Sequence, residues 1–238
     1  MLFRRKIYDK FLTWKNETAG QKALLIEGAR RIGKSTVVEE FAKNEYKSYI
    51  LIDFARASDN VKGYFREHLN DLDTFFMLLS VEYGVTLYPR ESVIIFDEVQ
   101  MFPKAREAIK YLVADGRYDY METGSLISIK ENVKDIVIPS EERHIRMYPL
   151  DFEEFCWALG EAPLMDYIRV CFDKKEPLER SLHNKAMLVW GQYLLVGGMP
   201  MSIVAFIVGH KDFGKADLEK RDILELYRND IMKIKAQY

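Results

Sequence analysis

Residues 26–41 read IEGARRIGKSTVVEEF. This segment begins with apolar residues and ends in a pattern typical of a helix, and it carries two glycines, two arginines and a lysine in between. Its central part, Gly28–Ser35, fits the pattern G-x-x-x-x-G-K-[ST] at every fixed position. A strand-like run precedes the pattern and a helix-like run follows it, which is the context that the pattern requires. The segment therefore predicts a loop that wraps a phosphate.

The residue types in this loop explain how it would hold that phosphate. Glycines let backbone N–H groups approach an anion closely, and the helix beginning near Lys34 directs its positive end to the same place. We expect Lys34 to contact the β- and γ-phosphates, Ser35 to bind Mg²⁺, and Thr36 to lie near the α-phosphate. Arg30 and Arg31 either strengthen this field or are solvated loop arginines. The predicted nucleotide-binding residues are Gly28, Ala29, Arg30, Arg31, Ile32, Gly33, Lys34, Ser35 and Thr36.

A second motif, SVIIFDEVQ, occupies residues 92–100. Its apolar part predicts a buried strand that ends at Asp97 and Glu98, and ligands of open α/β sheets bind at that edge. Because burying unpaired carboxylates is costly, we expect Asp97 to hold Mg²⁺ through water and Glu98 to polarise the attacking water as a general base. The alternative is a surface Asp-Glu pair that ends an ordinary strand. Gln100 could also face the site, but the sequence assigns it no necessary role.

A third candidate lies at another predicted strand end, Thr123-Gly124-Ser125. A hydroxyl there can orient water or sense the γ-phosphate, and Thr123 is the first choice, followed by Ser125. The alternative is a tight turn that uses Gly124. The predicted catalytic residues are thus Glu98, Lys34 and Thr123, and the predicted metal ligands are Ser35 and Asp97.

Apolar runs and helical patterns alternate over the first part of the chain. This alternation is typical of an α/β fold, with a parallel sheet covered on both faces. From Asp151 the pattern becomes helical: DFEEFCWALG reads as a helix with Asp151 as N-cap and Gly160 just past its end. The VGGMP segment (196–200) is interpreted as a turn between helices, and a lid hinge at Gly197 and Gly198 is the alternative. The five predicted strands span residues 23–28, 48–54, 92–99, 119–125 and 144–150.

Composition excludes several classes of protein. The net charge of −2 shows no global signature of a nucleic-acid or membrane binder. The presence of only two cysteines, Cys156 and Cys171, argues against a disulfide framework, and four scattered histidines without Cys-x-x-Cys argue against zinc. We find no signal peptide and no run of about 18 apolar residues. A reduced, cytoplasmic protein with no membrane partner is expected.

Together these motifs resemble the AAA+ branch of P-loop ATPases, and most closely a prokaryotic group within it. The motifs that carry the resemblance are GARRIGKST (28–36), DEVQ (97–100), TGS (123–125), YPLDFEEF (148–155) and YLLVGGMP (193–200). The similarity covers nearly the whole chain. The first two motifs are specific to the ATPase class, and the last two point to the group.

The resemblance implies a P-loop NTPase fold with three αβα layers and a parallel sheet in the order 5-1-4-3-2, followed by a helical lid. That order would place Thr123 between Lys34 and Asp97, as a γ-phosphate sensor requires. Residues 1–150 would form the nucleotide-binding AAA+ core and residues 151–238 the lid. Relatives usually carry a further C-terminal domain. The last helical pattern ends without a clear cap, so a truncated chain and a frayed terminal helix both remain open.

AAA+ assemblies commonly use an arginine finger that reaches the γ-phosphate of a neighbouring subunit. Arg143 and Arg146 lie in a suitable region, but PSEERHIRMYPL lacks the Gly-Arg that many relatives have there. Arg143 is the candidate, and a surface salt bridge is the alternative. No arginine stands out in the sensor position of the lid.

Three functions follow from these motifs. The first is an ATPase that hydrolyses Mg²⁺-ATP to ADP and phosphate and thereby drives conformational work on a protein or nucleic-acid partner, with a homo-oligomer as an open expectation. The second is a nucleotide-gated switch or scaffold with slow turnover. A small-molecule phosphotransferase is disfavoured because it needs no Glu98 beside Asp97 and usually has an arginine-rich lid. A GTPase is disfavoured because no Asn-Lys-x-Asp segment occurs.

Overall fold

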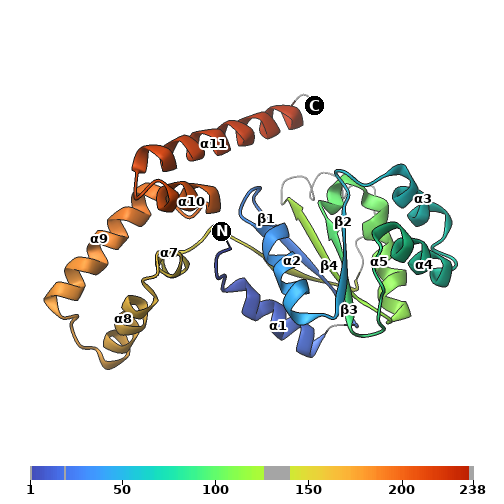
Figure 1. Cartoon of the computed structure of the whole chain (residues 1–238), viewed down its shortest axis with the longest axis horizontal. Coiled ribbons are helices and arrows are strands. Elements are labelled where there is room, and N and C mark those ends of the chain that lie inside the picture. The colour runs from blue at the N-terminus through green and yellow to red at the C-terminus, as the bar shows by residue number, and fades with distance from the viewer. Residues whose placement is uncertain (1, 19, 126–139, 236–238) are drawn as a thin grey trace. The chain divides into compact units, whose positions relative to one another are not determined.

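The computed structural model of the chain describes residues 2–18, 20–125 and 140–235 (Figure 1). Contacts divide the chain into two compact units. We call Ile7–Met147 the α/β unit, and we call Met1–Lys6 with Tyr148–Tyr238 the helical unit. The sequence pattern placed residues 1–150 together, whereas the contacts divide the chain after Met147 and group the first six residues with the helical unit.

The α/β unit is built on a five-stranded sheet in which every neighbouring pair is parallel. The strand order is β2-β3-β4-β1-β5, which confirms the predicted order 5-1-4-3-2 read from the other edge. Strand β4 therefore lies between β1 and β3. The strands are β1 Ala23–Gly28, β2 Ser48–Asp53, β3 Ser92–Asp97, β4 Asp119–Ser125 and β5 Glu142–Arg146.

The prediction for the fifth strand was wrong at both ends, because it placed the strand at residues 144–150. Strand β5 begins at Glu142, which pairs with Ala23 of β1, and ends at Arg146. The Met147 N–H still donates to the Glu27 carbonyl (2.8 Å). After Met147 the chain passes into the helical unit.

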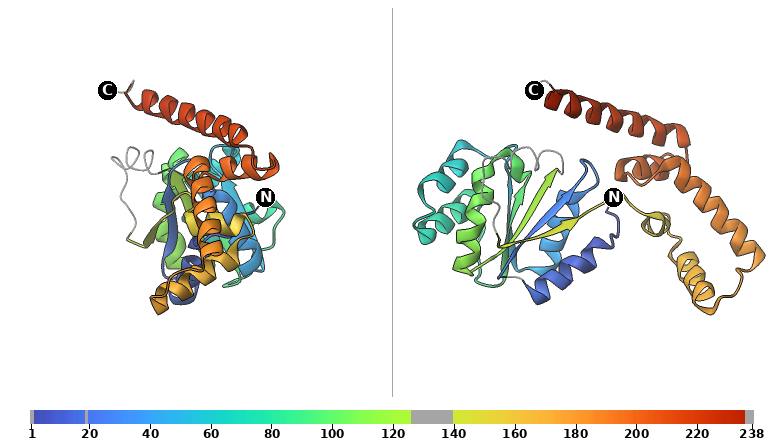
Figure 2. Two further views of the ribbon diagram at one scale, coloured as in Figure 1. Left: turned by 90° about the vertical axis from the view of Figure 1, so that its left-hand side faces the viewer. Right: turned by 180° about the vertical axis from the view of Figure 1, so that it is seen from behind.

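Helices cover both faces of this sheet, which confirms the three-layer αβα fold. Figures 1 and 2 show α1 and α2 on one face and α3, α4 and α5 on the other. On the second face, edge-to-face rings join the sheet to these helices, with centroids 5.5 Å apart for Phe65–Phe96 and 5.0 Å for Phe65–Phe75. Burying each such ring contributes about 1.5–3 kcal/mol. The helices are α1 Ile7–Glu17, α2 Lys34–Glu45, α3 Asp59–Glu67, α4 Leu72–Tyr83, α5 Pro103–Asp115 and the 3₁₀ turn η1 Val99–Met101.

In the helical unit, the segment that starts at Tyr148 leads into a capped helix, as the sequence predicted. The Asp151 carboxylate accepts from the Glu154 N–H (2.9 Å), and the Glu154 carboxylate accepts from the Asp151 N–H (3.2 Å). This reciprocal capping box satisfies two N–H groups that the helix itself leaves unpaired. The helices are α7 Phe152–Ala158, α8 Ala162–Lys174, α9 Arg180–Val196, α10 Pro200–Val208 and α11 Phe213–Lys235.

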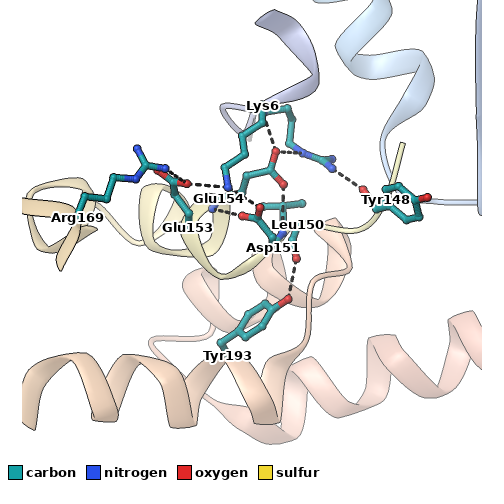
Figure 3. A network of polar contacts seen from close by, with 9 residues as sticks. Lys6, Tyr148, Leu150, Asp151, Glu153, Glu154, Arg169 and Tyr193 are labelled. Carbon is teal, nitrogen blue, oxygen red and sulfur yellow. Dashed lines mark hydrogen bonds and ion pairs between the residues drawn. The ribbon is translucent and has the colours of Figure 1, made fainter. Parts of the chain in front are cut away.

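The N-terminal residues join this helical unit through the same capped helix (Figure 3). The Arg5 guanidinium bonds the Glu154 carboxylate (3.2 Å) and the Tyr148 carbonyl (2.6 Å), and the Lys6 N–H donates to Glu154 (2.7 Å). Arg5 and Glu154 are both buried. A buried charge without its partner is strongly destabilising, so this ion pair favours the packing of Arg5 and Lys6 against α7.

The motifs YPLDFEEF (148–155) and YLLVGGMP (193–200) contact each other within the helical unit. VGGMP forms the turn between α9 and α10, as predicted, with Gly197 at φ 77 and ψ −175, a conformation nearly restricted to glycine. The Leu150 N–H donates to the Gly198 carbonyl (2.8 Å), and the Tyr193 hydroxyl donates to the Leu150 carbonyl (3.1 Å). A Cβ at Gly198 would lie 2.1 Å from that Leu150 oxygen. Only glycine permits this approach of the two backbones.

Among the helices in the described part of the chain, none alone is long and apolar enough to cross a membrane. By length and composition only, the bent pair Arg180–Val196 and Pro200–Val208, which meet at 119°, passes the same test together.

Candidate functional site

The predicted phosphate loop connects the end of β1 to the start of α2. Gly28 ends the strand, and a Cβ at this position would lie 2.4 Å from the Met147 carbonyl oxygen. Gly33 precedes the helix in the left-handed conformation, with φ 91 and ψ 25. Both fixed glycines of the motif are therefore required by the backbone. The predicted strand–loop–helix context is confirmed, and the positive end of α2 lies at the loop.

Lys34 lies at the first position of α2 and is only 6% exposed. Its ammonium group donates to the carbonyls of Gly28 (3.1 Å) and Ala29 (2.8 Å), so it lies against the loop. Burial lowers the pKa of Lys34 below its usual value of 10.5, although the carboxylates of Glu98 and Asp97 oppose this shift. A bound polyphosphate would place negative charge beside this buried ammonium group.

The structure brings the three predicted motifs together at the carboxyl edge of the sheet. The Ser35 hydroxyl donates to Asp97 Oδ1 (2.7 Å), and the Thr123 hydroxyl donates to the same oxygen. Thr123 Oγ1 also accepts from the Glu98 N–H (3.2 Å). Strand β4 makes this possible because it lies between β1 and β3. A continuous line of hydrogen bonds thus connects Ser35, Asp97, Thr123 and Glu98.

Glu98 has an unusual backbone for a residue with a side chain. It adopts the left-handed conformation, with φ 52 and ψ 46, directly after β3 and before η1. Such strain is common at functional sites. One of its carboxylate oxygens, Oε2, accepts a hydrogen bond from Gln100 Nε2. The sequence left Gln100 without a role, and its position two residues after Glu98 in DEVQ was the available signal.

The remaining predicted loop residues differ in how exposed they are to solvent. Ile32 is fully buried and anchors the loop in the core, whereas Ala29, Arg30, Arg31 and Thr36 are exposed. Arg31 has φ 64, so the loop requires a second left-handed residue before Gly33. The nucleotide contacts assigned to these side chains stay predictions.

The second-choice hydroxyl lies beside the first glycine of the phosphate loop, whereas the arginine-finger candidates lie on β5. Ser125 ends β4 in register with Gly28 and is buried. Arg143 pairs in register with Leu24, near the amino end of the sheet, and its guanidinium lies 3.6 Å from the Glu17 carboxylate. The surface salt bridge given as the alternative is therefore present. Arg146, at the other end of β5, is exposed, and neither arginine gains support as a finger.

The oxygen donors at this edge fit Mg²⁺. Mg²⁺ prefers hard oxygen ligands and is usually held by one or two protein groups together with substrate phosphates and water. Ser35 Oγ and Asp97 Oδ1 are 2.7 Å apart and lie beside the phosphate loop, so the hydroxyl and the carboxylate could both face one ion. Their roles as metal ligands stay predictions.

A second group of charges is buried one residue before Thr123. Glu122 is fully buried on β4, and the Arg106–Glu142 pair lies nearby with two hydrogen bonds of 2.9 and 2.7 Å. His144 Nε2 lies 3.0 Å from the same Glu142 carboxylate. Burial, and then the charge of Glu142, raise the pKa of Glu122 well above 4.5, although Arg106 opposes them. The folded chain therefore favours the protonated form of Glu122 more than the unfolded chain does.

We expect Glu122→Gln to raise the Tm at about pH 8 by several degrees and to have little effect at about pH 5. The pKa of Glu122 is higher in the folded chain than in the unfolded chain. Its contribution to stability is therefore present at low pH and is lost as the pH rises above 4.5, when the unfolded chain releases the proton first. Glutamine has no proton to lose.

Thermal unfolding followed by circular dichroism across this pH range measures the difference. Glu17→Gln, which changes an exposed carboxylate, is the control. A Tm difference between Glu122→Gln and wild type that does not grow with pH would mean that Glu122 is ionised in the folded chain.

Comparison with known proteins identifies a matching family. A family model described as an AAA domain matches residues 20–156, which is more than half of the chain. No curated protein matches the chain. Among solved structures, a structure of C. elegans PCH-2 is similar to it with a TM-score of 0.41 and 12% sequence identity. The similarity covers 94% of this chain and 66% of that one, so the chain spans less than two thirds of that protein's length.

Proposed function

The chain belongs to the AAA domain family, and we propose that it binds ATP with Mg²⁺ and hydrolyses it to ADP and phosphate. One observation carries this proposal. The hydrogen bonds among Ser35, Asp97, Thr123 and the Glu98 N–H join three separate motifs beside the loop that holds Lys34. Hydrolysis of a phosphoanhydride needs a phosphate cradle, a metal site and a base, and these residues offer all three at one edge of the sheet.

Each residue has a distinct role in this proposal. The loop N–H groups and the start of α2 bind the phosphates, while Lys34 moves from the Gly28 and Ala29 carbonyls to the phosphate oxygens. Mg²⁺, held by Ser35 and Asp97, would neutralise phosphate charge and orient the γ-phosphate. Glu98 accepts the proton of the attacking water. Thr123 holds Asp97 and the Glu98 backbone in place through its hydroxyl, beside its predicted part in sensing the γ-phosphate.

We also propose that hydrolysis drives conformational work on a macromolecular partner, protein or nucleic acid, with the helical unit acting as a lid. We propose as well that the chain belongs to the prokaryotic group and that it assembles into a homo-oligomer. A cytoplasmic location is supported by the two cysteines, Cys156 and Cys171, which are both free, as in a reducing compartment.

The second candidate is a nucleotide-gated switch with slow turnover. The observation that favours it is the ion pair between the Arg143 guanidinium and the Glu17 carboxylate (3.6 Å), which was the alternative to an arginine finger. Without an arginine that stabilises the transition state, related enzymes hydrolyse slowly. A switch would use the same loop and metal ligands, so binding alone does not separate the two functions.

Steady-state phosphate release by the wild-type chain, with Mg²⁺-ATP and with excess EDTA, separates them. We expect turnover that depends on Mg²⁺ and that EDTA abolishes, together with saturable binding of a fluorescent ATP analogue. Tight binding with negligible turnover would replace the ATPase with the switch. Absence of nucleotide binding would overturn both.

A further inference from the structure

The side chain of Gln100 lies against the proposed general base. Its Nε2 donates a hydrogen bond to Glu98 Oε2, and Gln100 is only 8% exposed. It lies on η1, the 3₁₀ turn that is separated from β3 by Glu98. The contact therefore joins two residues of one short segment at the carboxyl edge of the sheet.

The segment around Gln100 is fixed by the core. Val99 and Phe102 are both buried, and the ring of Phe102 lies 5.4 Å from that of Phe54. The backbone of Glu98 is held separately, because its N–H donates to Thr123 Oγ1 (3.2 Å). Gln100 is thus a donor on a rigid support, and it acts on a carboxylate whose backbone is already immobilised.

The hydrogen bond from Gln100 fixes the orientation of the Glu98 carboxylate, and this orientation matters for catalysis. A general base must direct one oxygen to the water that it activates, and the carboxylate of a glutamate otherwise rotates broadly about its last torsion. A donor on Oε2 stops this rotation and leaves Oε1 able to accept the proton of water. Because the donor is a neutral amide, it orients the carboxylate without the full charge of lysine or arginine, which would weaken the base.

We propose that Gln100 is a positioning residue that holds the Glu98 carboxylate in the orientation needed to activate water. This inference rests on the proposed ATPase activity. It adds a further polar residue to the site, one that touches neither the nucleotide nor the metal. Its effect is confined to the chemical step, so it is visible in kcat and not in nucleotide affinity.

Gln100→Met, which keeps the size of the side chain but removes the donor, tests this assignment. We expect kcat to fall about 10- to 100-fold with KM within about twofold of wild type, because small displacements of a reacting group have effects of this size. Gln100→Glu keeps the shape but places a like charge beside Glu98, and it should lower kcat at least as far. Met101→Ala, on the same turn at a residue that is 59% exposed, is the control and should match wild type.

A second measurement needs neither nucleotide nor turnover. In the nucleotide-free chain, the side-chain N–H resonances of Gln100 should shift when Glu98 is replaced by alanine. Exposed glutamine amides such as that of Gln21 should not shift. This measurement decides the question even if Gln100→Met fails to fold, since an unshifted Gln100 amide would contradict the contact.

The outcomes separate the two proposals. If wild type hydrolyses ATP and Gln100→Met keeps its kcat, or raises KM alone, the role of Gln100 is overturned while the ATPase stands. If wild type does not hydrolyse ATP at all, the proposed function fails and the positioning role fails with it. A lowered kcat, an unchanged KM and a shifted amide together support the inference.

Discussion

Glu98→Gln should leave ATP binding intact and lower kcat by about 100- to 10,000-fold, the usual contribution of a general base. The substitution keeps the size of the side chain and its carbonyl oxygen, so the hydrogen bond from Gln100 can persist. The Glu98 N–H, which donates to Thr123, is unaffected. What the variant loses is the basic carboxylate that would take the proton of water.

Steady-state phosphate release, measured in parallel with binding of a fluorescent ATP analogue, tests this expectation. Glu107→Gln removes an exposed carboxylate from α5 and should behave as wild type. Hydrolysis by Glu98→Gln at the wild-type rate would exclude Glu98 as the base. Loss of binding would instead indicate that the substitution disturbs the loop.

Lys34→Ala should weaken ATP binding by about 100-fold or more. Hydrogen bonds from a charged group contribute roughly 1.5–3 kcal/mol each, and Lys34 is expected to reach two phosphates. Folding should suffer much less. The buried ammonium donates to two loop carbonyls, at 3.1 and 2.8 Å, and burial already lowers its pKa.

Titration with the fluorescent analogue gives the affinity, and the Tm with and without Mg²⁺-ATP reports binding independently. Lys104→Ala removes an exposed lysine from α5 and serves as the control. Lys34→Ala that binds ATP with normal affinity would remove the phosphate-loop assignment. An unchanged Tm in the absence of nucleotide would show that the loss of affinity is not a loss of folding.

Structural features that depend only on residues close together along the chain could be predicted from the sequence. The apolar run before Gly28 and the motif that follows predicted β1, the loop and α2, since strand burial and loop chemistry are local. The N-cap at Asp151 and the turn at Gly197 were predictable for the same reason. The order of the strands could not be predicted from local patterns, because such patterns do not say which strands pair. It followed only from the resemblance.

Contacts between distant segments were decided by the tertiary structure. Ser35 and Thr123 meet at Asp97 only because β4 lies between β1 and β3, and side-chain rotamers then set the hydrogen bonds. The same holds for Gly198, whose need for glycine arises from the Leu150 carbonyl of another segment. Residue types and spacing thus determined which groups the chain carries. Packing of segments far apart in the chain determined which of those groups touch, because the free energy of a side-chain contact depends on distance in space rather than along the chain.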